Sequence, residues 1–291
     1  MSGIAVDHES VYWTSTTSIL YRAGTVVKVA LGGGTPTTLA AGFLSPSGLA
    51  VDSQDAYFVD YEASVVASVG LNGGKVTILS RPPQPLSIVV AGSKLFWTAP
   101  TGVAELSAAD GSAPVVKDDN TSYGNSISAQ ALAVGSGSVY WTDWGDVARW
   151  DLSSGSVSIV ALDQDFPLGI AVDSTYVYWV NQGQNCSDSG VGPCPDTGSI
   201  VRAPVVGGAP TTLASKLMSP SYIALDEASI YRTDSVSTVR KMPLQGGSVV
   251  TLASKQLFPL AIAVDSTSVY WVNGGGANSM NTGTVVKLTP K

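Results

Sequence analysis

The sequence is short of charged residues and nearly without histidine, and both shortages limit what the protein can do. Charged residues make up 13% of its 291 residues, about half the usual share in globular proteins. The 15 lysines and arginines are scattered and the formal net charge is −7. The chain therefore lacks the grouped cations that bind nucleic acid or an anionic membrane. The single histidine, His8, counts against a Ser-His-Asp triad and against lyase chemistry that needs a histidine base.

Long apolar runs and cysteines are also scarce. No apolar run reaches the roughly 18 residues of a membrane-spanning helix, so we expect no membrane insertion, and no signal peptide precedes the repeat sequence that follows Met1. Cys186 and Cys194 lie eight positions apart in a loop rich in glycine and proline. They are either two free thiols or a local disulfide, and we favour the disulfide because exposed thiols oxidise. A disulfide needs an oxidising compartment, so we expect an exported protein (periplasmic, cell-surface or extracellular) whose signal is absent from this sequence.

What the sequence does have is a repeated unit of about 42 residues. Two copies, residues 167–181 and 259–273, differ at only two positions. Each unit carries an aromatic pair or its remnant, and the first members of these pairs are Tyr12, Tyr57, Phe96, Tyr140, Tyr178, Tyr231 and Tyr270. Five positions before them stand Asp7, Asp52, Ala91, Gly135, Asp173, Asp226 and Asp265. The constant spacing defines seven units.

Each unit contains four short runs rich in valine, isoleucine, threonine and aromatic residues, separated by turn residues. A four-strand meander of this length is one propeller blade. We therefore predict an all-β seven-bladed β-propeller with four-stranded antiparallel blades, a single domain over residues 1–291, and a monomer. Gly33-Gly34 and similar pairs predict two-residue hairpin turns between the third and fourth strands. The predicted blades are approximately residues 1–41, 42–80, 81–117, 118–161, 162–215, 216–254 and 255–291.

The seventh unit lacks an outer strand. It ends with the third-strand run Val285-Val286-Lys287-Leu288, followed by Pro290-Lys291. We predict a last blade of three strands that closes by packing of blades. The alternative is that upstream residues, removed from this sequence, supplied the fourth strand.

One copy of the aromatic pair carries a family resemblance. Tyr140-Trp141-Thr142-Asp143 matches the YWTD motif, and Gly-Ile-Ala-Val-Asp at 169–173 fits the lead-in of the same repeats. Over nearly its whole length the chain resembles the YWTD-repeat propellers of low-density-lipoprotein receptors, and also uncharacterised secreted bacterial propellers. The receptor domains are six-bladed, whereas this chain has seven aromatic pairs. The resemblance implies the fold and little about function, because propellers host many unrelated activities.

Loop lengths distinguish two faces of the predicted propeller. Connections from strand one to two, and from three to four, barely vary. Connections from strand two to three, and from strand four to the next blade, vary, and we call these the top connections. From the first aromatic to the polar residue of strand three the chain runs 9 residues in blade 4 (Tyr140 to Arg149) and 24 in blade 5 (Tyr178 to Arg202). Variable loops on a constant scaffold usually carry function. The candidate ligand-binding residues on this top face are Tyr61, Glu62, Tyr123, Asp143, Trp144, Tyr222 and Arg232.

Other polar residues have both a functional and a structural interpretation. The aspartates before the aromatics could form a carboxylate ring for a divalent cation such as Ca²⁺, but we favour aspartates that cap their own turns. In blade 6, Arg232 replaces the second aromatic, and Tyr222 stands where other blades carry glycine or alanine. A cation in a slot built for tryptophan is either paired structurally or contacts an anion. The recurring cations of strand three are expected to be solvated, and they are Lys28, Arg149, Arg202, Lys241 and Lys287.

Aromatic residues beside carboxylates and amides suit stacking combined with directional hydrogen bonds. We therefore predict a non-catalytic binding propeller, without a cofactor, whose top face binds a glycan, a peptide or a protein partner. The alternative is a metal-dependent lactonase-like or lyase-like enzyme that uses carboxylates at the top of the channel. A purely structural spacer is a third interpretation.

The disulfide can be tested directly. Titration of the unreduced, denatured protein with a thiol reagent should give no reactive groups, because the sulfurs of Cys186 and Cys194 are joined. Reduction should then release two thiols. Two reactive thiols before reduction would remove the argument for an oxidising compartment.

Overall fold

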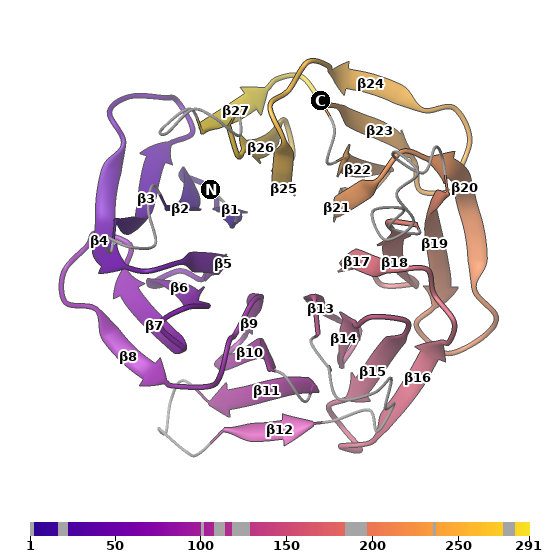
Figure 1. Cartoon of the computed structure of the whole chain (residues 1–291), viewed down its shortest axis with the longest axis horizontal. Coiled ribbons are helices and arrows are strands. Elements are labelled where there is room, and N and C mark those ends of the chain that lie inside the picture. The colour runs from indigo at the N-terminus through magenta and orange to yellow at the C-terminus, as the bar shows by residue number, and fades with distance from the viewer. Residues whose placement is uncertain are drawn as a thin grey trace, which may run out of the picture. The chain divides into compact units, whose positions relative to one another are not determined.

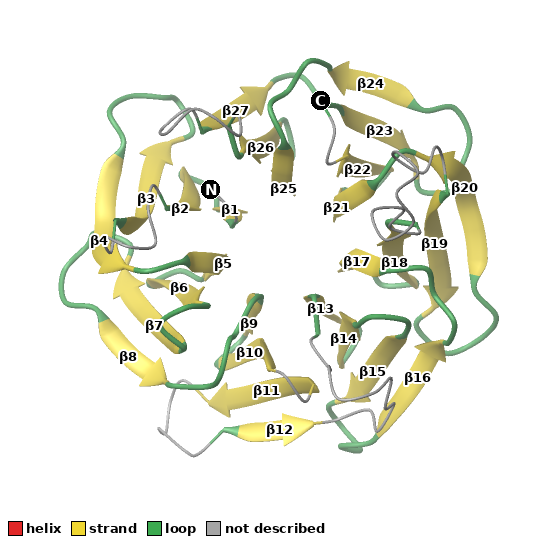
Figure 2. Ribbon diagram, viewed as in Figure 1, coloured by secondary structure: helices red, strands yellow, loops and turns green. Residues whose placement is uncertain are grey.

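The computed structural model describes residues 3–16, 23–99, 102–107, 114–117, 129–183, 197–234, 237–275 and 283–291. Within these ranges the chain forms only strands, turns and loops, and it is an all-β seven-bladed propeller (Figures 1 and 2). Six of the sheets found there have four antiparallel strands in chain order, and the last has three. The predicted fold class and the three-stranded last blade are confirmed. None of the described residues belongs to a helix that could cross a membrane.

Two compact units divide the chain: residues 1–117 with 263–291, and residues 118–262. A single domain over residues 1–291 therefore stays a prediction. The first unit holds blades 1 to 3 and most of blade 7. Blade 1 consists of β1 (Ile4–Val6), β2 (Ser10–Ser15), β3 (Gly24–Ala30) and β4 (Thr37–Phe43). Blade 2 consists of β5 (Pro46–Val51), β6 (Asp55–Asp60), β7 (Val65–Gly70) and β8 (Thr77–Ser80). Blade 3 consists of β9 (Ile88–Ala91), β10 (Lys94–Ala99), β11 (Gly102–Ser107) and β12 (Val115–Lys117).

The second unit holds blades 4 to 6. Blade 4 consists of β13 (Ala131–Gly135), β14 (Ser138–Thr142), β15 (Val147–Asp151) and β16 (Val157–Ala161). Blade 5 consists of β17 (Pro167–Val172), β18 (Tyr176–Asn181), β19 (Gly198–Pro204) and β20 (Thr211–Leu217). Blade 6 consists of β21 (Pro220–Leu225), β22 (Ser229–Asp234), β23 (Val239–Pro243) and β24 (Val250–Ala253). Blade 7, most of which belongs to the first unit, consists of β25 (Pro259–Val264), β26 (Val269–Asn273) and β27 (Thr284–Leu288).

The aromatic pairs form the core between neighbouring blades, as predicted. Residues alternate sides along a strand, so the two members of a pair face opposite ways. Trp97 of blade 3 packs on Tyr57 and Val59 of blade 2, and Trp179 of blade 5 packs on Tyr140 of blade 4. The first aromatic therefore faces the following blade and the second faces the preceding one.

Hydrogen bonds also cross between blades. The Oγ1 hydroxyl of Thr14 donates to the carbonyl of Ser47 at 2.8 Å, and that of Thr142 donates to the carbonyl of Leu168 at 2.7 Å. Close approach of the innermost strands explains the glycine at position 169. A Cβ there would lie 2.8 Å from the Cα of Tyr222 in β21.

The aspartates before the aromatics cap turns, and their second oxygen bonds the aromatic itself. In blade 5 the Oδ1 atom of Asp173 accepts hydrogen bonds from the backbone N–H groups of Thr175 and Tyr176, and its Oδ2 accepts one from the Tyr178 hydroxyl at 2.9 Å. The same arrangement recurs in four more blades, for the pairs Asp7–Tyr12, Asp52–Tyr57, Asp226–Tyr231 and Asp265–Tyr270. A tyrosine five positions after the aspartate is therefore placed so that its hydroxyl reaches back across the turn to the carboxylate.

These bonds perturb the titration of both partners. Burial, and then the bond to Asp173, raises the pKa of Tyr178 to about 12. Burial opposes ionisation of Asp265, but the hydrogen bonds from Tyr270 and from the turn outweigh it and lower the pKa of that carboxyl. Two blades lack the acid five positions before the aromatic: blade 3 has Ala91 before Phe96, and blade 4 has Gly135 before Tyr140.

Two expectations about the connections were wrong. The glycine pairs do not form two-residue hairpins: β3 ends at Ala30 and β4 begins only at Thr37, with Gly33 and Gly34 at φ +88° and +125° inside a longer loop. Nor are all the strand-three cations solvated. Arg202 donates to the carbonyl of Leu244 in the next blade at 3.0 Å.

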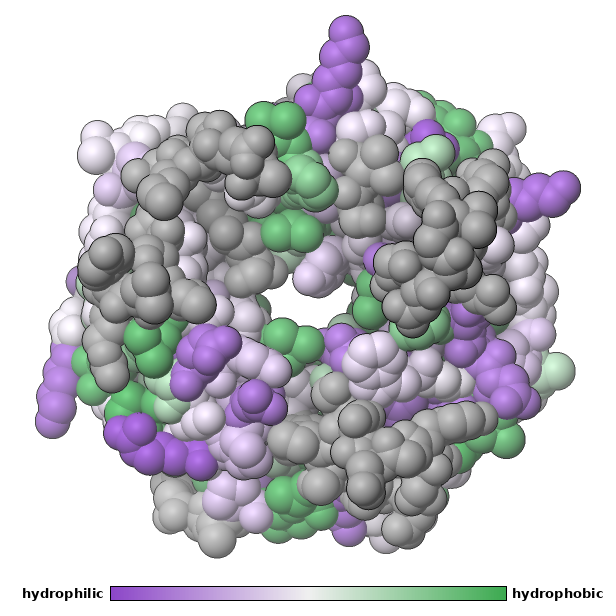
Figure 3. Space-filling view, viewed as in Figure 1, coloured by the Kyte–Doolittle hydropathy of each residue, from purple (hydrophilic) through white to green (hydrophobic). Residues whose placement is uncertain are grey.

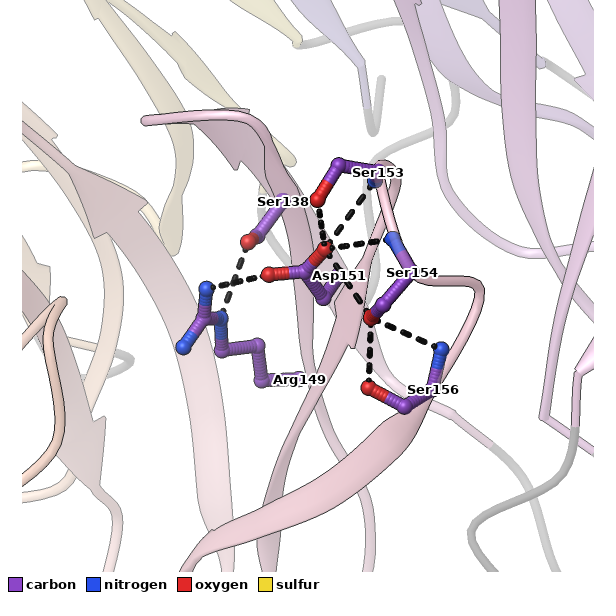
Figure 4. Close-up of polar contacts among 6 residues, drawn as sticks. All are labelled: Ser138, Arg149, Asp151, Ser153, Ser154 and Ser156. Atoms are coloured by element: carbon purple, nitrogen blue, oxygen red, sulfur yellow. Dashed lines mark hydrogen bonds and ion pairs between the residues drawn. The ribbon is translucent and has the colours of Figure 1, made fainter.

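Blade 4 uses its strand-three cation differently. Arg149 bonds the Oγ atom of Ser138 at 2.8 Å and pairs with Asp151 at 2.9 Å (Figure 4). Asp151 also accepts hydrogen bonds from the backbone N–H groups of Ser153 and Ser154, and hydrogen bonds from these residues hold its pKa well below the usual range. The cluster closes the turn between β15 and β16.

The last blade meets the first within the first unit. β26 contacts β1, which lies next to it near the N-terminal end (Figure 1). Nζ of Lys287 in β27 donates to the carbonyl of Leu31, at the end of blade 1's third strand, at 2.9 Å. The described residues provide no fourth strand beside β27. Blades 7 and 1 are therefore joined there by packing and by the bond from Lys287.

The tyrosine–aspartate bond predicts a difference between two identical substitutions. Tyr178→Phe should lower the free energy of unfolding by about 1.5–3 kcal/mol, because the carboxylate of Asp173 loses a donor. Tyr140→Phe, the matched control in a blade with Gly135 in place of the aspartate, should change it far less. Urea denaturation of both variants measures the difference, and equal losses would contradict the assignment.

Candidate functional site

A pocket of about 220 Å³ lies among the top connections of blades 4 and 5, within the second unit. Gln130 precedes β13, Phe166 and Leu168 flank the start of β17, and Gln182 follows β18. Asp143 and Trp144, between β14 and β15, also line the pocket. Two of the seven predicted ligand-binding residues, Asp143 and Trp144, thus line one pocket.

Trp144 is presented by a short turn that Asp143 holds. The Oδ1 atom of Asp143 accepts hydrogen bonds from the backbone N–H groups of Gly145 at 3.2 Å and Asp146 at 3.0 Å. The backbone of Asp143 also donates to the carbonyl of Asp146 at 3.1 Å. The carboxylate is buried and so positions the neighbouring indole, which is 46% exposed. All seven tryptophans fall in the described ranges, and the six others are buried there.

Phe166 packs against Trp144 from the next connection. The ring centroids are 5.6 Å apart at an interplanar angle of 76°, an edge-to-face pair. Phe166 has φ +55°, a left-handed conformation that is costly for a bulky residue. The equivalent residues Ser219 and Phe258, each before the proline that starts a blade, share a positive φ. Blades 5, 6 and 7 therefore share this backbone conformation, and in blade 5 it places a phenylalanine against the indole.

Backbone hydrogen bonds hold the three connections together. The N–H of Gln164 donates to the carbonyl of Gly145 at 2.6 Å, and the N–H of Gln182 donates to that of Phe166 at 2.9 Å. The side-chain oxygen of Gln164 accepts from Nε1 of Trp179 at 2.9 Å. These hydrogen bonds between the connections therefore fix the positions of Trp144 and Phe166 without a bound ligand.

The arrangement can stack one ring or hold one apolar group and hydrogen-bond its substituents. An exposed indole edged by a second ring offers a flat apolar surface, and the amide residues Gln130 and Gln182 also line the pocket. The volume is below the roughly 300–1,000 Å³ of pockets for drug-sized ligands. On the face that Figure 3 shows, hydrophobic and hydrophilic residues are interspersed.

The other predicted residues do not belong to this pocket's lining. Tyr61 and Glu62 lie in the first unit, in the β6–β7 connection, where Tyr61 is half-buried and donates its backbone N–H to the carbonyl of Ser45. Glu62 is exposed. Tyr123, Cys186 and Cys194 lie outside the described residues, so the disulfide stays a prediction. His8 is exposed between β1 and β2, away from the top connections.

Arg232 occupies the tryptophan slot of blade 6 and is only 2% exposed. It lies opposite Arg240 on β23 and Ile223 on β21. Its Nη1 atom has no hydrogen-bond partner within the described part of the chain. Burial, and then repulsion by Arg240, lowers the pKa of the guanidinium to about 10, while Asp234 opposes the shift. The side chain is therefore a desolvated cation in an interface between blades. Tyr222, on β21, is half-buried, and burial raises its pKa.

A second exchange explains why Arg232 is poorly satisfied. In blade 5 the residue three positions before the proline that starts the blade is Gln164, which bonds Trp179. The same position before blade 6 is Leu217, a buried apolar residue. Both positions thus differ between blades 5 and 6, and a comparison of the repeats reveals this where neither residue alone would.

Comparisons with known proteins support the fold alone. No family model and no curated protein sequence matches the chain. Among solved structures, the WD40 β-propeller domain of Doa1 matches with a TM-score of 0.73 and 14% identity, covering 98% of this chain and 91% of that one. Streptogramin B lyase matches with a TM-score of 0.66 and 12% identity, covering 85% and 83%. A chain of the nidogen–laminin complex matches with a TM-score of 0.57 and 18% identity, covering 81% and 89%. The class of protein is thus a seven-bladed β-propeller with neighbours of several functions.

The exchanged pair in blade 6 gives a stability prediction. The double substitution Leu217→Gln with Arg232→Trp restores the blade 5 arrangement and removes a desolvated charge, so the free energy of unfolding should rise by about 1–4 kcal/mol. Denaturant titration measures it, and the matched control is Leu217→Gln alone. A double variant less stable than the parent would show that Arg232 is structurally required.

Proposed function

We propose that the protein is a non-catalytic binding propeller that holds a sugar ring of a glycan in the pocket beside Trp144. The observation that carries the proposal is the edge-to-face pair of Trp144 and Phe166 in a pocket that Gln130 and Gln182 also line. A sugar ring presents an apolar face to an indole and hydroxyls to amides, and such a site suits this combination. A peptide or protein partner is the other outcome that the test below allows.

The test uses Trp144 both as ligand contact and as reporter. Because it is the one exposed tryptophan of the described set, it should dominate quenching of fluorescence by acrylamide, and a bound sugar should protect it. Trp144→Ala should weaken glycan binding by about tenfold to a hundredfold, the equivalent of roughly 1.4–2.8 kcal/mol. A panel of immobilised glycans and peptides, read by fluorescence titration, measures this.

Phe258→Ala is the matched control. Phe258 precedes the proline that starts blade 7, as Phe166 precedes the one that starts blade 5, with a similar φ of +52°, and it is exposed but lies outside the pocket lining. Its substitution should leave binding unchanged. If Trp144 is not protected by any glycan but is protected by a peptide, the ligand class is wrong and the site is right. If no ligand protects Trp144, the proposed function fails.

The metal-dependent enzyme stays the alternative hypothesis. Among the described residues no three His, Cys, Asp or Glu side chains gather in a group that could hold a metal ion. The five aspartates considered for a carboxylate ring are engaged in turn caps and in bonds to tyrosine. Export of the protein is proposed on the cysteine pair alone.

A further inference from the structure

The four connections that supply the loop residues of the pocket beside Trp144 are rich in acid and carry no cation. They join β12 to β13 (residues 118–130), β14 to β15 (143–146), β16 to β17 (162–166) and β18 to β19 (182–197). Their sequences contain eight aspartates and no lysine or arginine, whereas the whole chain has a net charge of only −7. The aspartates are Asp118, Asp119, Asp143, Asp146, Asp163, Asp165, Asp188 and Asp196. Asp118, Asp119, Asp188 and Asp196 lie outside the described residues.

Within the described part of the chain, aspartates stand directly beside both rings of the aromatic pair. Asp143 precedes Trp144 and itself lines the pocket. Asp165 precedes Phe166 and is half-buried, and Asp163 of the same connection is exposed. The two short connections that carry the rings therefore also carry carboxylates close to them.

No positively charged side chain belongs to the described lining of this pocket. Arg149, on β15, pairs with Asp151 at 2.9 Å and closes the turn between β15 and β16. Other top connections of the described chain do carry exposed cations, such as Arg81 before β9 and Lys255 before β25. The imbalance of charge is therefore a property of the connections around this pocket.

Two physical effects then favour a positive charge on the ligand. A cleft surrounded by charges of one sign attracts ligands of the opposite sign and repels those of the same sign. The face of an indole ring carries the negative part of its quadrupole, so it attracts a cation that lies within about 6 Å of the ring centroid. Trp144 is 46% exposed and can supply such a contact. Both effects disfavour sugars that carry a carboxylate or a sulfate.

We propose that the ligand of the pocket is an amino sugar, a ring that carries a protonated amine, as glucosamine does. This inference rests on the proposed function and names the sugar class that it leaves open. The ring packs on Trp144, and its ammonium group is stabilised by the carboxylates of Asp143 and Asp165. The hydroxyls hydrogen-bond to Gln130 and Gln182. Acetylation of the amine removes the charge and retains the ring, so the pocket discriminates between the two forms.

A matched pair of ligands tests the charge alone. A tetramer of glucosamine and a tetramer of N-acetylglucosamine have the same rings and linkage. Each is titrated at about pH 6, well below the pKa of an ordinary α-amino group, and binding is read as protection of Trp144 from acrylamide. The glucosamine tetramer should bind at least about tenfold more tightly. This preference should disappear when salt is raised from about 0.01 M to about 1 M, because the Debye length falls from about 30 Å to about 3 Å.

Neutral variants of the protein test the same charge from the other side. The double substitution Asp163→Asn with Asp165→Asn keeps the side-chain shape, and asparagine tolerates the φ of +55° at position 163. It should weaken binding of the glucosamine tetramer by about threefold to tenfold and leave the acetylated tetramer unchanged. Glu227→Gln is the matched control, because Glu227 is exposed in the connection between β21 and β22 and lies outside the pocket lining. Melting temperatures confirm that both variants are folded.

The outcomes separate this inference from the proposed function. If both tetramers protect Trp144 equally, the amino-sugar inference is wrong and the glycan site stands. If the glucosamine tetramer binds the Trp144→Ala variant as tightly as the parent, it is attracted to the acidic surface in general, and the inference is again wrong. If a lysine-rich peptide protects Trp144 and neither tetramer does, the ligand is a basic peptide. If no sugar of any kind protects Trp144, the glycan proposal itself fails.

Discussion

Every blade is a sheet with two apolar faces, and the burial of both faces is the constraint on which the rest of the structure depends. One meander cannot meet it alone, since a thin sheet has no second layer to cover it. The repeat solves this with the aromatic pair, whose members point to opposite sides of strand two. Trp179 covers blade 4 while its neighbour Tyr178 faces blade 6. The tyrosine hydroxyl then returns to a turn aspartate at the edge of the same blade, so that a residue chosen for its bulk also closes a loop.

Departures from the repeat mark the places where burial is imperfect. In blade 6 the slot holds Arg232 opposite Arg240, with Leu217 where blade 5 has an amide. In blade 7 no strand among the described residues pairs with the outer edge of β27, whose valines are only half-buried. At the pocket of blades 4 and 5 an indole is exposed on a braced turn. Each is a local deficit in burial or pairing, and each can be recognised because other blades show the complete arrangement.

Much of the architecture could be predicted from residues alone. The spacing of five between Asp173 and Tyr178 recurs because two backbone N–H groups and one hydroxyl must reach the same carboxylate, and that is local geometry. The candidate site could be predicted only in part. Asp143 and Trp144 stood out by their place in a top connection, but Phe166, Gln130 and Gln182 come from three other connections and meet them only after the blades pack. The hairpins were misjudged because Gly33-Gly34 permits several turn shapes, and the length of the connection depends on where β4 finds its register on β3.

Sequence by itself determined the number of units and their four-strand pattern, because these follow from periodicity and turn chemistry within about 42 residues. Tertiary structure alone decided which side chains share a pocket and which cations reach a neighbouring blade. It also decided which of the two identical pentapeptides, 24–28 and 283–287, is covered by a fourth strand among the described residues. The physical reason is that burial is a property of the neighbour: Val26 and Val285 lie in identical pentapeptides and differ only in what packs against them.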